Sequence, residues 1–279
     1  MLMILLKSMM FKISIITINK NNIEGLEKTI NSVINQTYSD FEFIIIDGAS
    51  TDRSVDLIKE NNAKINFWIS EPDSGIYNAM NKGILKSNGE YLLFLNSGDF
   101  LNDDSVLYDI ALELKDSNVE IFSGSLWIFD KNNKTHLIQP AKEVSIYHCI
   151  HKGILHPCTF IKKTLFETYG LYNEENKYIS DFEFFIKTCG LHNIEYRYTS
   201  REISCFNTLG ITSQEKNIEE LEIEAAKSIK KIVPEPIRKD IERLRNLEIL
   251  FEQKEIKDFL KLKSKPFIFK IISKIISWI

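Results

Sequence analysis

Polar and acidic residues follow apolar runs at three places in the first half of the chain. Thr17 to Asn19 end the first run, Asp47 follows Phe43 to Ile46, and Asp99 comes shortly after Tyr91 to Leu95. Open α/β sheets bind their ligands beyond the carboxyl ends of the strands. Carboxylates gathered there suit a divalent cation and a nucleotide, because a metal held by oxygen ligands neutralises a diphosphate.

The apolar runs that position these residues alternate with helical patterns. We predict four buried strands, at residues 13–18, 43–46, 65–69 and 91–95. Helical spacing predicts intervening helices after Asn22, after the loop 48–52 and over residues 76–86. This order predicts an α/β fold with an open, doubly wound, mostly parallel sheet flanked by helices.

The second half is less regular. Short strands are expected around Val119 to Phe129, and the segment with His148 and His151 is expected to be a mobile loop. Ser180 is expected to cap a helix over residues 181–189, which Gly190 closes.

The last part of the chain has a charged helical pattern. It starts at Gln214, and breaks are expected at Pro234 and Pro236. We therefore predict one α/β domain over residues 11–212 and a helical C-terminal extension over residues 213–279.

Composition excludes several classes of protein. The 279 residues carry 35 basic and 39 acidic side chains, a net charge of −4. This charge argues against a nucleic-acid partner, because a protein that binds nucleic acid needs a basic face. With 44% hydrophobic and 27% charged residues, the chain is neither collagen-like nor wholly disordered. Four cysteines lack zinc or disulfide spacing, and we expect them to be reduced core residues of a cytoplasmic protein: Cys149, Cys158, Cys189 and Cys205.

Several common catalytic motifs are absent from the sequence. It has no P-loop, no G-x-G-x-x-G after the first strand, no H-E-x-x-H zinc site and no G-x-S-x-G nucleophile elbow. Readings as a P-loop ATPase, a classical dinucleotide-binding protein, a zinc protease or an α/β-hydrolase are therefore weak.

Four segments together resemble the family 2 glycosyltransferases, which are inverting enzymes with a GT-A fold. They are the run from Ile13 to Lys20, FEFIIIDGASTDRS, EPDSGIYNAMNKG and YLLFLNSGD. The resemblance covers roughly residues 12–210 and, within the family, looks most like bacterial enzymes that build capsule, exopolysaccharide or O-antigen. It implies a Rossmann-like sheet, a nucleoside-diphosphate sugar donor, a glycan or lipid-linked acceptor, and Mn²⁺ or Mg²⁺.

The resemblance also implies roles for individual residues at the donor site. The positions that match the family's nucleotide-sugar site are Thr17, Asn19, Asp47, Asp73, Ser97 and Gly98. Asp47 matches the acidic residue that accepts a hydrogen bond from the nucleotide base. The alternative role for Asp47 is that of an aspartate in a loop turn. Asp52 is equally well explained as a helix-start residue, and Asn81 and Lys82 as exposed or capping helix residues.

Metal binding is implied at one carboxylate. Asp99 matches the last acidic residue of the family's D-x-D motif, which binds the metal that bridges the diphosphate. Asn96, Ser97 and Gly98 stand where acidic residues are often found, so the sequence departs from the full motif. One carboxylate with phosphate oxygens and water still holds a hard cation, with weak affinity in the absence of donor.

The catalytic base is implied further along the chain. Asp181, in YISDFEFF, matches the family's catalytic acidic residue, and a helix N-terminus would keep it ionised. The alternative role for Asp181 is that of a charged residue in the first helical turn that takes no part in catalysis. Glu183 is the weaker candidate for the base. His156, in HPCTF, resembles a histidine beneath the acceptor site, and a structural role or a metal contact remain alternatives.

The C-terminal segment has a charge opposite to that of the body. Residues 259–279 contain five lysines and no acidic residue, and the polar residues of 267–279 form one stripe on an apolar helix. Thirteen helical residues span roughly 20 Å, too short to cross a bilayer. We expect peripheral contact with the inner face of the cell membrane, and the alternatives are packing on the enzyme's own core or on a second subunit of a homo-oligomer.

Taken together, the sequence predicts an inverting glycosyltransferase of bacterial surface polysaccharide synthesis. Two alternatives stay open. A sugar nucleotidyltransferase shares a nucleotide-binding sheet but needs a glycine-rich, arginine-bearing loop that is missing here. A catalytically inactive scaffold or binding protein of the polysaccharide machinery would be compatible with the reduced acidic motif.

Overall fold

The computed structural model describes residues 13–115, 117–130, 133–192, 194–208 and 218–253, together with Lys270. The chain divides into two compact units, residues 1–229 and 230–279. The described elements are β1 (Ile13–Asn19), α2 (Ile23–Ile34), β2 (Phe41–Asp47), α3 (Ser54–Glu60), η1 (Asn62–Lys64), β3 (Phe67–Ser70), α4 (Ile76–Lys86), β4 (Tyr91–Phe94), β5 (Phe100–Leu101), α5 (Val106–Leu114), β6 (Ile121–Asp130), β7 (Asn133–Ile138), α6 (Ile146–His151), η2 (His156–Cys158), β8 (Thr159–Lys162), α7 (Thr164–Tyr169), α8 (Ser180–Phe185), η3 (Ile186–Leu191), β9 (Tyr196–Asn207), α9 (Ile218–Ile232) and α10 (Glu235–Glu252).

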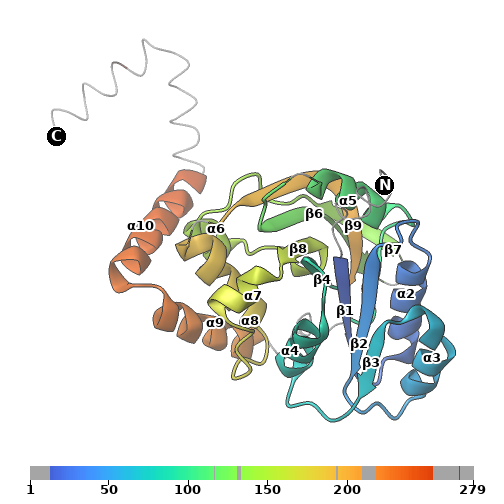
Figure 1. Cartoon of the computed structure of the whole chain (residues 1–279). Helices are drawn as coiled ribbons and strands as arrows, with labels where there is room; N and C mark the ends of the chain where they lie inside the picture. The colour runs from blue at the N-terminus through green and yellow to red at the C-terminus, as the bar shows by residue number, and fades with distance from the viewer. Residues whose placement is uncertain are drawn as a thin grey trace. The chain divides into compact units, whose positions relative to one another are not determined.

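Within the described ranges, nine strands form one sheet in the order β3-β2-β1-β4-β8-β6-β9-β5, with β7 paired to β6 (Figure 1). Strands β1 to β4 are parallel, because β1 pairs with β2 and β4, and β2 pairs with β3. Antiparallel β8 joins β4 to β6, and β6 runs parallel to β9. The predicted α/β fold with a mostly parallel sheet, flanking helices and C-terminal helices is confirmed.

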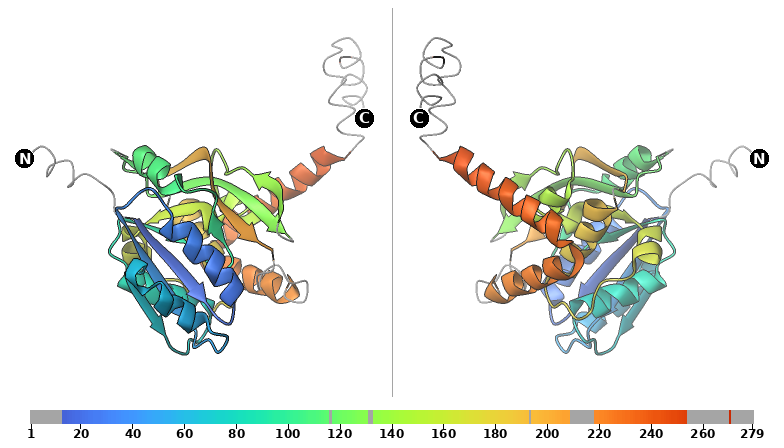
Figure 2. Two further views of the ribbon diagram at one scale, coloured as in Figure 1. Left: turned by 90° about the vertical axis from the view of Figure 1, so that its right-hand side faces the viewer. Right: turned by 90° about the vertical axis from the view of Figure 1, so that its left-hand side faces the viewer.

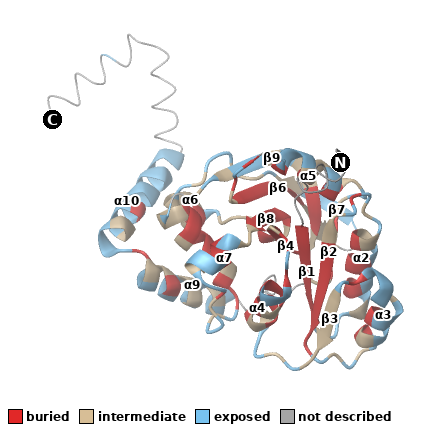
Figure 3. Ribbon diagram, in the orientation of Figure 1, coloured by how far each residue is buried: buried red, intermediate tan, exposed pale blue. Residues whose placement is uncertain are grey.

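Strand β1 is an inner strand between β2 and β4 and is buried along its whole length (Figure 3). Alternate side chains point to opposite faces of a strand. Ile15 packs in the core cluster that includes Leu26 of α2 and Ile110 of α5, and Ile16 lies against Gly83 of α4. Helices α2 and α4 cover opposite faces of the sheet (Figure 2). A Cβ at Gly83 would lie 2.4 Å from Ile16 Cγ2, so glycine at this position permits the close approach of α4 to the sheet.

The predicted elements of the first half agree closely with the structure. Asn22 caps α2 as expected, because its side chain accepts the N–H of Gly25 at 3.2 Å. Helix α4 has the predicted bounds. The third strand begins at Phe67 rather than Ile65, because the short helix η1 ends at Lys64 and Ile65 serves as its C-cap.

The predicted caps around residue 180 are wrong. Ser180 is the first residue of α8, and Ile179 before it makes no side-chain cap. The Ser180 hydroxyl instead accepts the N–H of Asn173. Gly190 does not close the helix, because it lies within η3, the π-helix that continues α8 to Leu191.

The C-terminal helices follow the predicted charged pattern. Pro234 separates α9 from α10, but the break expected at Pro236 is wrong. Pro236 lies in the first turn of α10, where a helix needs no N–H donor. None of the helices in the described ranges combines the length and apolar composition needed to cross a bilayer. All four cysteines are buried and free, as predicted.

Candidate active site

The carboxyl ends of β1, β2 and β4 lie next to one another at one edge of the sheet. Asn19 pairs with Asp47 in the β1–β2 register. The N–H of Ser97, just after β4, donates to the carbonyl of Ile18 at 3.0 Å. The structure therefore brings these predicted donor-site residues together at one sheet edge.

Asp47 organises the loop that follows β2. Its carboxylate is fully buried and accepts four hydrogen bonds, from Asn19 Nδ2 at 2.8 Å, from the Ser50 N–H at 2.9 Å, and from the hydroxyls of Ser50 and Ser70, each at 2.6 Å. Asp52 lies two residues before α3 and accepts the N–H and hydroxyl of Ser54, the first residue of that helix, as well as the N–H of Ile23 at 2.9 Å. These contacts shape the loop between β2 and α3.

Thr17 and Asn19 differ in whether their side chains keep a free hydrogen-bonding atom. Thr17 is fully buried, and its hydroxyl donates to the carbonyl of Leu95 at 2.7 Å, which joins the ends of β1 and β4. The Asn19 amide nitrogen is bound to Asp47 and Ser50, so the orientation of the amide is determined. Its Oδ1 is buried and has no hydrogen-bond partner in the described part of the chain.

Helix α2 holds the turn that carries Ser97 and Gly98. Asn22 Nδ2 donates to the Ser97 carbonyl at 2.9 Å. Thr29 accepts the Gly98 N–H at 3.0 Å and donates its hydroxyl to the Asp99 carbonyl at 2.7 Å. Gly98 has a φ of 107°, which residues with a side chain rarely adopt. Glycine is therefore required for the shape of this turn.

Asp99 is buried at this edge, with 4% of its surface exposed. Its Oδ1 accepts the N–H of Asn207, at the end of β9, at 3.0 Å. Burial raises the pKa of Asp99 to about 7, and the hydrogen bond from Asn207 only partly opposes this effect. The carboxyl therefore changes its charge near neutral pH.

The residues around Asp99 fit a metal only as an open, oxygen-rich site. Among the described residues, no group of three or more histidine, cysteine, aspartate and glutamate side chains could hold a metal ion. The buried Oδ1 of Asn96, three residues before Asp99, has no partner in these ranges and would be a second hard oxygen for a cation. A divalent cation held here would need phosphates and water as its other ligands.

Asp73 lies in the loop before α4. Its Oδ1 accepts the N–H of Gly75 at 3.1 Å. The loop is tied to the sheet edge, since the Glu71 N–H donates to the Asp47 carbonyl at 3.0 Å. Lys82 pairs with Glu71 at 2.7 Å, so this lysine supports the loop from α4.

Asp181 lies in the first turn of α8, and its side chain is 27% exposed. The hydroxyl of Tyr77, in the first turn of α4, donates to Asp181 Oδ1 at 2.6 Å. Its Oδ2 is 3.8 Å from His156 Nδ1. One carboxylate oxygen is thus occupied by a donor, and the other is next to an imidazole.

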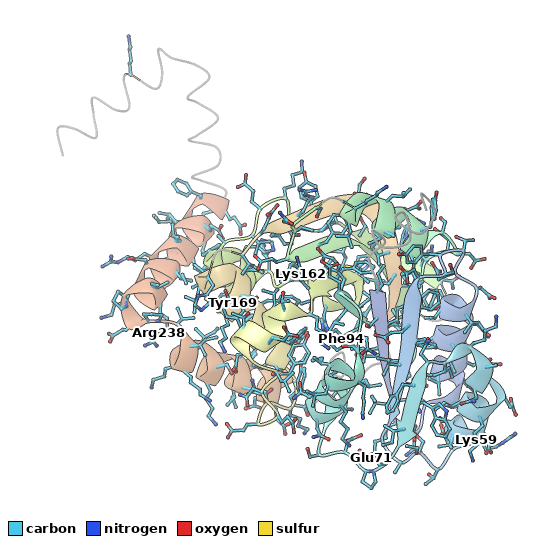
Figure 4. All side chains as sticks on the ribbon, viewed as in Figure 1. Lys59, Glu71, Phe94, Lys162, Tyr169 and Arg238 are labelled. Atoms are coloured by element: carbon cyan, nitrogen blue, oxygen red, sulfur yellow. The ribbon has the colours of Figure 1, made fainter. Side chains whose placement is uncertain are left out.

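His156 is buried between aromatic rings. It stacks on Phe94, which Figure 4 labels at the end of β4, with ring centroids 4.8 Å apart. Its Nε2 is 2.9 Å from the Tyr172 hydroxyl. Burial lowers the pKa of His156, and the nearby Asp181 charge only partly offsets this. The ring is therefore neutral at neutral pH, which argues against an ion pair with Asp181.

His148 and His151 are not in a loop, and that prediction is wrong. Both belong to α6, where the Ser145 hydroxyl caps the helix by accepting the His148 N–H at 3.2 Å. A cavity of about 380 Å³ lies between this helix and the sheet, and its wall includes His148, Lys152, Ile154, Leu155 and Tyr196. Leu155 directly precedes His156, so the cavity adjoins the segment that carries this histidine.

Two residues hold the segment before Asp181 in ways that the sequence did not indicate. Asn81 is buried rather than exposed or capping, and it binds both the N–H and the carbonyl of Tyr172, at 3.0 and 2.9 Å. From α9, Glu224 accepts the N–H groups of Lys177 and Tyr178. Helical spacing alone could not indicate these partners, because each is more than 40 residues away along the chain.

Glu183 has a different environment from Asp181. Its Oε2 accepts from Asn176 Nδ2 and from the Ser228 hydroxyl, each at 2.7 Å. This carboxylate therefore faces α9 and fastens the segment before α8.

Comparison with known proteins agrees with this geometry. A sequence model described as glycosyl transferase family 2 matches residues 14–176. An uncharacterized glycosyltransferase from Mycobacterium tuberculosis (strain CDC 1551) is 29% identical over 212 residues, which cover 72% of this chain and 77% of the relative. A PGL/p-HBAD biosynthesis glycosyltransferase from Mycobacterium bovis (strain BCG) is 26% identical over 205 residues, which cover 72% and 78%.

Two solved structures have a similar fold. S. aureus TarS 1–349 in complex with UDP-GlcNAc matches with a TM-score of 0.63 at 19% identity, over 82% of this chain and 69% of that chain. The mannosyltransferase PcManGT from Pyrobaculum calidifontis, in complex with GDP-Man and Mn²⁺, matches with a TM-score of 0.55 at 12% identity, over 90% and 84%. The likeness supports the GT-A fold assignment.

Replacing Asp99 by asparagine should change how stability depends on pH. The pKa of Asp99 rises from an ordinary 3.8 to about 7 on folding, so the folded state holds a proton that the unfolded state loses. Wild-type stability should fall from about pH 4 to pH 7 and then level off, by up to about 4 kcal/mol. Asp99→Asn lacks this loss, so its free energy of unfolding relative to that of wild type should increase from about pH 4 to pH 7.

Urea unfolding in EDTA at pH 5, 6, 7 and 8 measures the effect. The exposed Asp104 is the matched control, and Asp104→Asn should keep the wild-type pH dependence. A stability difference between Asp99→Asn and wild type that is the same at every pH would contradict the prediction.

Proposed function

This chain belongs to glycosyltransferase family 2, and from that premise we propose that it is an inverting enzyme of bacterial surface polysaccharide synthesis. It transfers a sugar from a nucleoside-diphosphate donor to a glycan or lipid-linked acceptor. The observation that carries the proposal is the carboxylate of Asp181, which is partly exposed and has one oxygen bound to Tyr77. Such a group is suited to accept a proton.

Asp181 is the proposed catalytic base. Its Oδ2 takes the proton of the acceptor hydroxyl as the acceptor oxygen forms a bond to the anomeric carbon. The bond from that carbon to the diphosphate breaks, and the electron pair leaves with the diphosphate. A single displacement of this kind inverts the anomeric configuration.

The donor is proposed to bind at the carboxyl ends of β1, β2 and β4. The orphaned Oδ1 of Asn19 supports this, because a buried acceptor without a partner is costly unless a ligand donates to it. Asp47 would accept a hydrogen bond from the nucleotide base in place of the bond from one of its two serine partners, Ser50 or Ser70. The Thr17 hydroxyl is already bound to the Leu95 carbonyl, so Thr17 would support the site by holding β1 and β4 together.

Asp73, Ser97 and Gly98 are proposed to line the diphosphate and sugar. Asp73 holds the loop at the start of α4 through the Gly75 N–H. The turn at Gly98 places backbone groups at the sheet edge, where α2 holds it rigidly. Rigid polar groups of this kind need no reorganisation when a ligand binds.

Asp99, with the Asn96 side-chain oxygen, is proposed to hold Mn²⁺ or Mg²⁺. When bound, the cation stabilises negative charge on the leaving diphosphate. Because the pKa of Asp99 is raised to about 7, the carboxyl must lose a proton in order to bind metal near neutral pH. Metal affinity should therefore increase with pH over this range.

The acceptor is proposed to bind on the side of His156, whose neutral ring lies beside Asp181. The adjoining cavity of about 380 Å³ has the size of a small-molecule site. Contact with the inner membrane surface through residues 267–279 is proposed from the sequence pattern. Apart from Lys270, that segment lies outside the described residues.

Asp181→Asn should abolish transfer and leave donor binding nearly intact. The amide cannot accept the proton, so turnover should fall roughly 10²- to 10⁴-fold. Release of labelled sugar from a panel of UDP-, GDP- and dTDP-sugars measures turnover, and thermal shift measures donor binding. Glu183→Gln is the control on the same helix and should remain active. Full turnover by Asp181→Asn would contradict the assignment.

Asp99→Ala should weaken donor binding that depends on metal. Calorimetric titration of UDP, with Mn²⁺ and with EDTA, should show a metal-dependent gain in affinity for wild type and for the control Asp104→Ala. The gain should be largely lost in Asp99→Ala. An equal gain in all three proteins would exclude Asp99 as a metal ligand.

Deleting residues 267–279 should release the protein from anionic liposomes. The deletion removes the apolar residues of the segment and two of the five lysines of residues 259–279, Lys270 and Lys274, and each lysine near an anionic surface contributes about 1 kcal/mol. Co-sedimentation with vesicles of phosphatidylglycerol and phosphatidylcholine measures binding, and vesicles of phosphatidylcholine alone test the charge. Undiminished binding after deletion would contradict a membrane role for the segment.

A further inference from the structure

The hydrogen bond between Tyr77 and Asp181 joins two helices that are far apart along the chain. Tyr77 belongs to the first turn of α4, and Asp181 to the first turn of α8. The bond is 2.6 Å long, and Tyr77 is 4% exposed. A short bond from a buried hydroxyl to a carboxylate is among the stronger types of hydrogen bond in proteins.

We propose that Tyr77 is a positioning residue for the catalytic base, and that its hydroxyl holds Asp181 Oδ1 so that Oδ2 receives the acceptor proton. The inference rests on the proposed function, because it takes Asp181 as the base. Carboxylate oxygens exchange places when a side chain rotates, and a fixed donor on one of them prevents this. A base held in one orientation needs less rearrangement to reach the transition state.

The direction of this hydrogen bond follows from the two groups. An ionised carboxylate only accepts, so the phenol must donate. Burial and the nearby charge of Asp181 raise the pKa of Tyr77 well above its ordinary value of 10. The hydroxyl therefore keeps its proton at any pH at which an enzyme works.

Two other groups near Asp181, His156 and Tyr172, are neutral. His156, from η2, is buried, and its Nδ1 lies beyond hydrogen-bond distance from Oδ2, at 3.8 Å. Tyr172 is bound to His156 through its hydroxyl. Two nearby acids are bound elsewhere, since Glu183 faces α9 and Glu174 accepts from two asparagines of α4. Tyr77 is the described residue that donates to the carboxylate.

Tyr77 is itself held firmly. Its ring lies 5.5 Å from the ring of Tyr172, which in turn makes edge-to-face contacts with Phe94, Phe166 and Phe184. Asn81, one turn further along α4, binds the backbone of Tyr172. The phenol is therefore fixed both by its helix and by its ring contacts, as a positioning residue must be.

Tyr77→Phe tests the inference, because it removes the hydroxyl and keeps the ring. The probe is hydrolysis of UDP-GlcNAc with Mn²⁺, or of whichever UDP-, GDP- or dTDP-sugar is turned over fastest. We expect kcat to fall roughly ten- to 100-fold with an unchanged KM for the donor. A carboxylate that loses a donor holds its proton to higher pH, so the acid limb of the rate profile should move upward.

Tyr91→Phe is the matched control. Tyr91 is fully buried and also donates its hydroxyl to a protein oxygen, the carbonyl of Val119, at 2.5 Å. This variant loses a buried hydroxyl at a position without contact to Asp181, so it should keep the wild-type kcat and acid limb. An equal change of kcat and pH profile in both variants would mean a general structural effect and would overturn the inference.

A second variant avoids any loss of packing. Site-specific replacement of Tyr77 by 3-fluorotyrosine keeps the ring and the hydroxyl but makes the hydroxyl a stronger donor. The acid limb should then move to lower pH, opposite to the shift in Tyr77→Phe. An unmoved limb in this variant overturns the inference, whether or not Tyr77→Phe folds.

The outcome for Asp181→Asn separates this inference from the proposed function. If Asp181→Asn is fully active, Asp181 is not the base, and both proposals are overturned. If Asp181→Asn is inactive while Tyr77→Phe keeps the wild-type kcat and pH profile, only the positioning role of Tyr77 is overturned.

Discussion

The central constraint in this protein is the burial of β1 between two parallel neighbours. Every residue of the strand is buried, including Thr17 and Asn19. A buried polar side chain needs a partner, and these two find theirs on β2 and just after β4. The bonds that satisfy β1 therefore also bring three strand ends into one polar edge.

The same constraint explains how the loops at that edge are held. Asp47 is fully buried; two of its four hydrogen bonds order the loop after β2 through Ser50, and the other two bind the ends of β1 and β3 through Asn19 and Ser70. Thr29 of α2 does the same for the turn after β4. Loop residues that bind ligands are most effective when a rigid scaffold positions them, and here the scaffold reaches each loop through a buried side chain.

Asp99 and Asp181 are two carboxyls in contrasting environments. Asp99 is almost completely buried and accepts the N–H of Asn207, but burial dominates and raises its pKa to about 7. Asp181 keeps part of its surface in solvent and has a tyrosine hydroxyl as its donor. Different environments give carboxyls different tasks within one site, which is consistent with metal binding at one and proton transfer at the other.

The sequence predicted the elements whose pattern is local. The strands β1, β2 and β4 and the helices α2 and α4 were predicted because apolar periodicity reports burial directly. The fold class followed from their order. The meeting of Asn19, Asp47 and Ser97 at one sheet edge was predictable because parallel strands end at the same edge. Their roles in donor binding and the role of Asp181 as the base came from the family resemblance and stay predictions.

The sequence did not predict what depends on contacts between distant segments. Ser180 has the chemistry of a cap, but the N–H of Asn173 takes its hydroxyl. His148 and His151 looked like loop residues because a short helix has little periodicity. Tyr77 looked like an ordinary helix residue, since its partner is 104 positions away. Such pairings depend on tertiary packing, which a single sequence does not reveal.

Helix α4 connects the two halves of the proposed reaction. Its preceding loop is ordered by Asp73 at the donor edge, and Tyr77 in its first turn holds Asp181. Gly83 allows the same helix to pack directly on Ile16 of β1. One helix packed on β1 therefore lies between the Asp73 loop and the proposed base, so a change in how α4 packs would move the loop and Asp181 together.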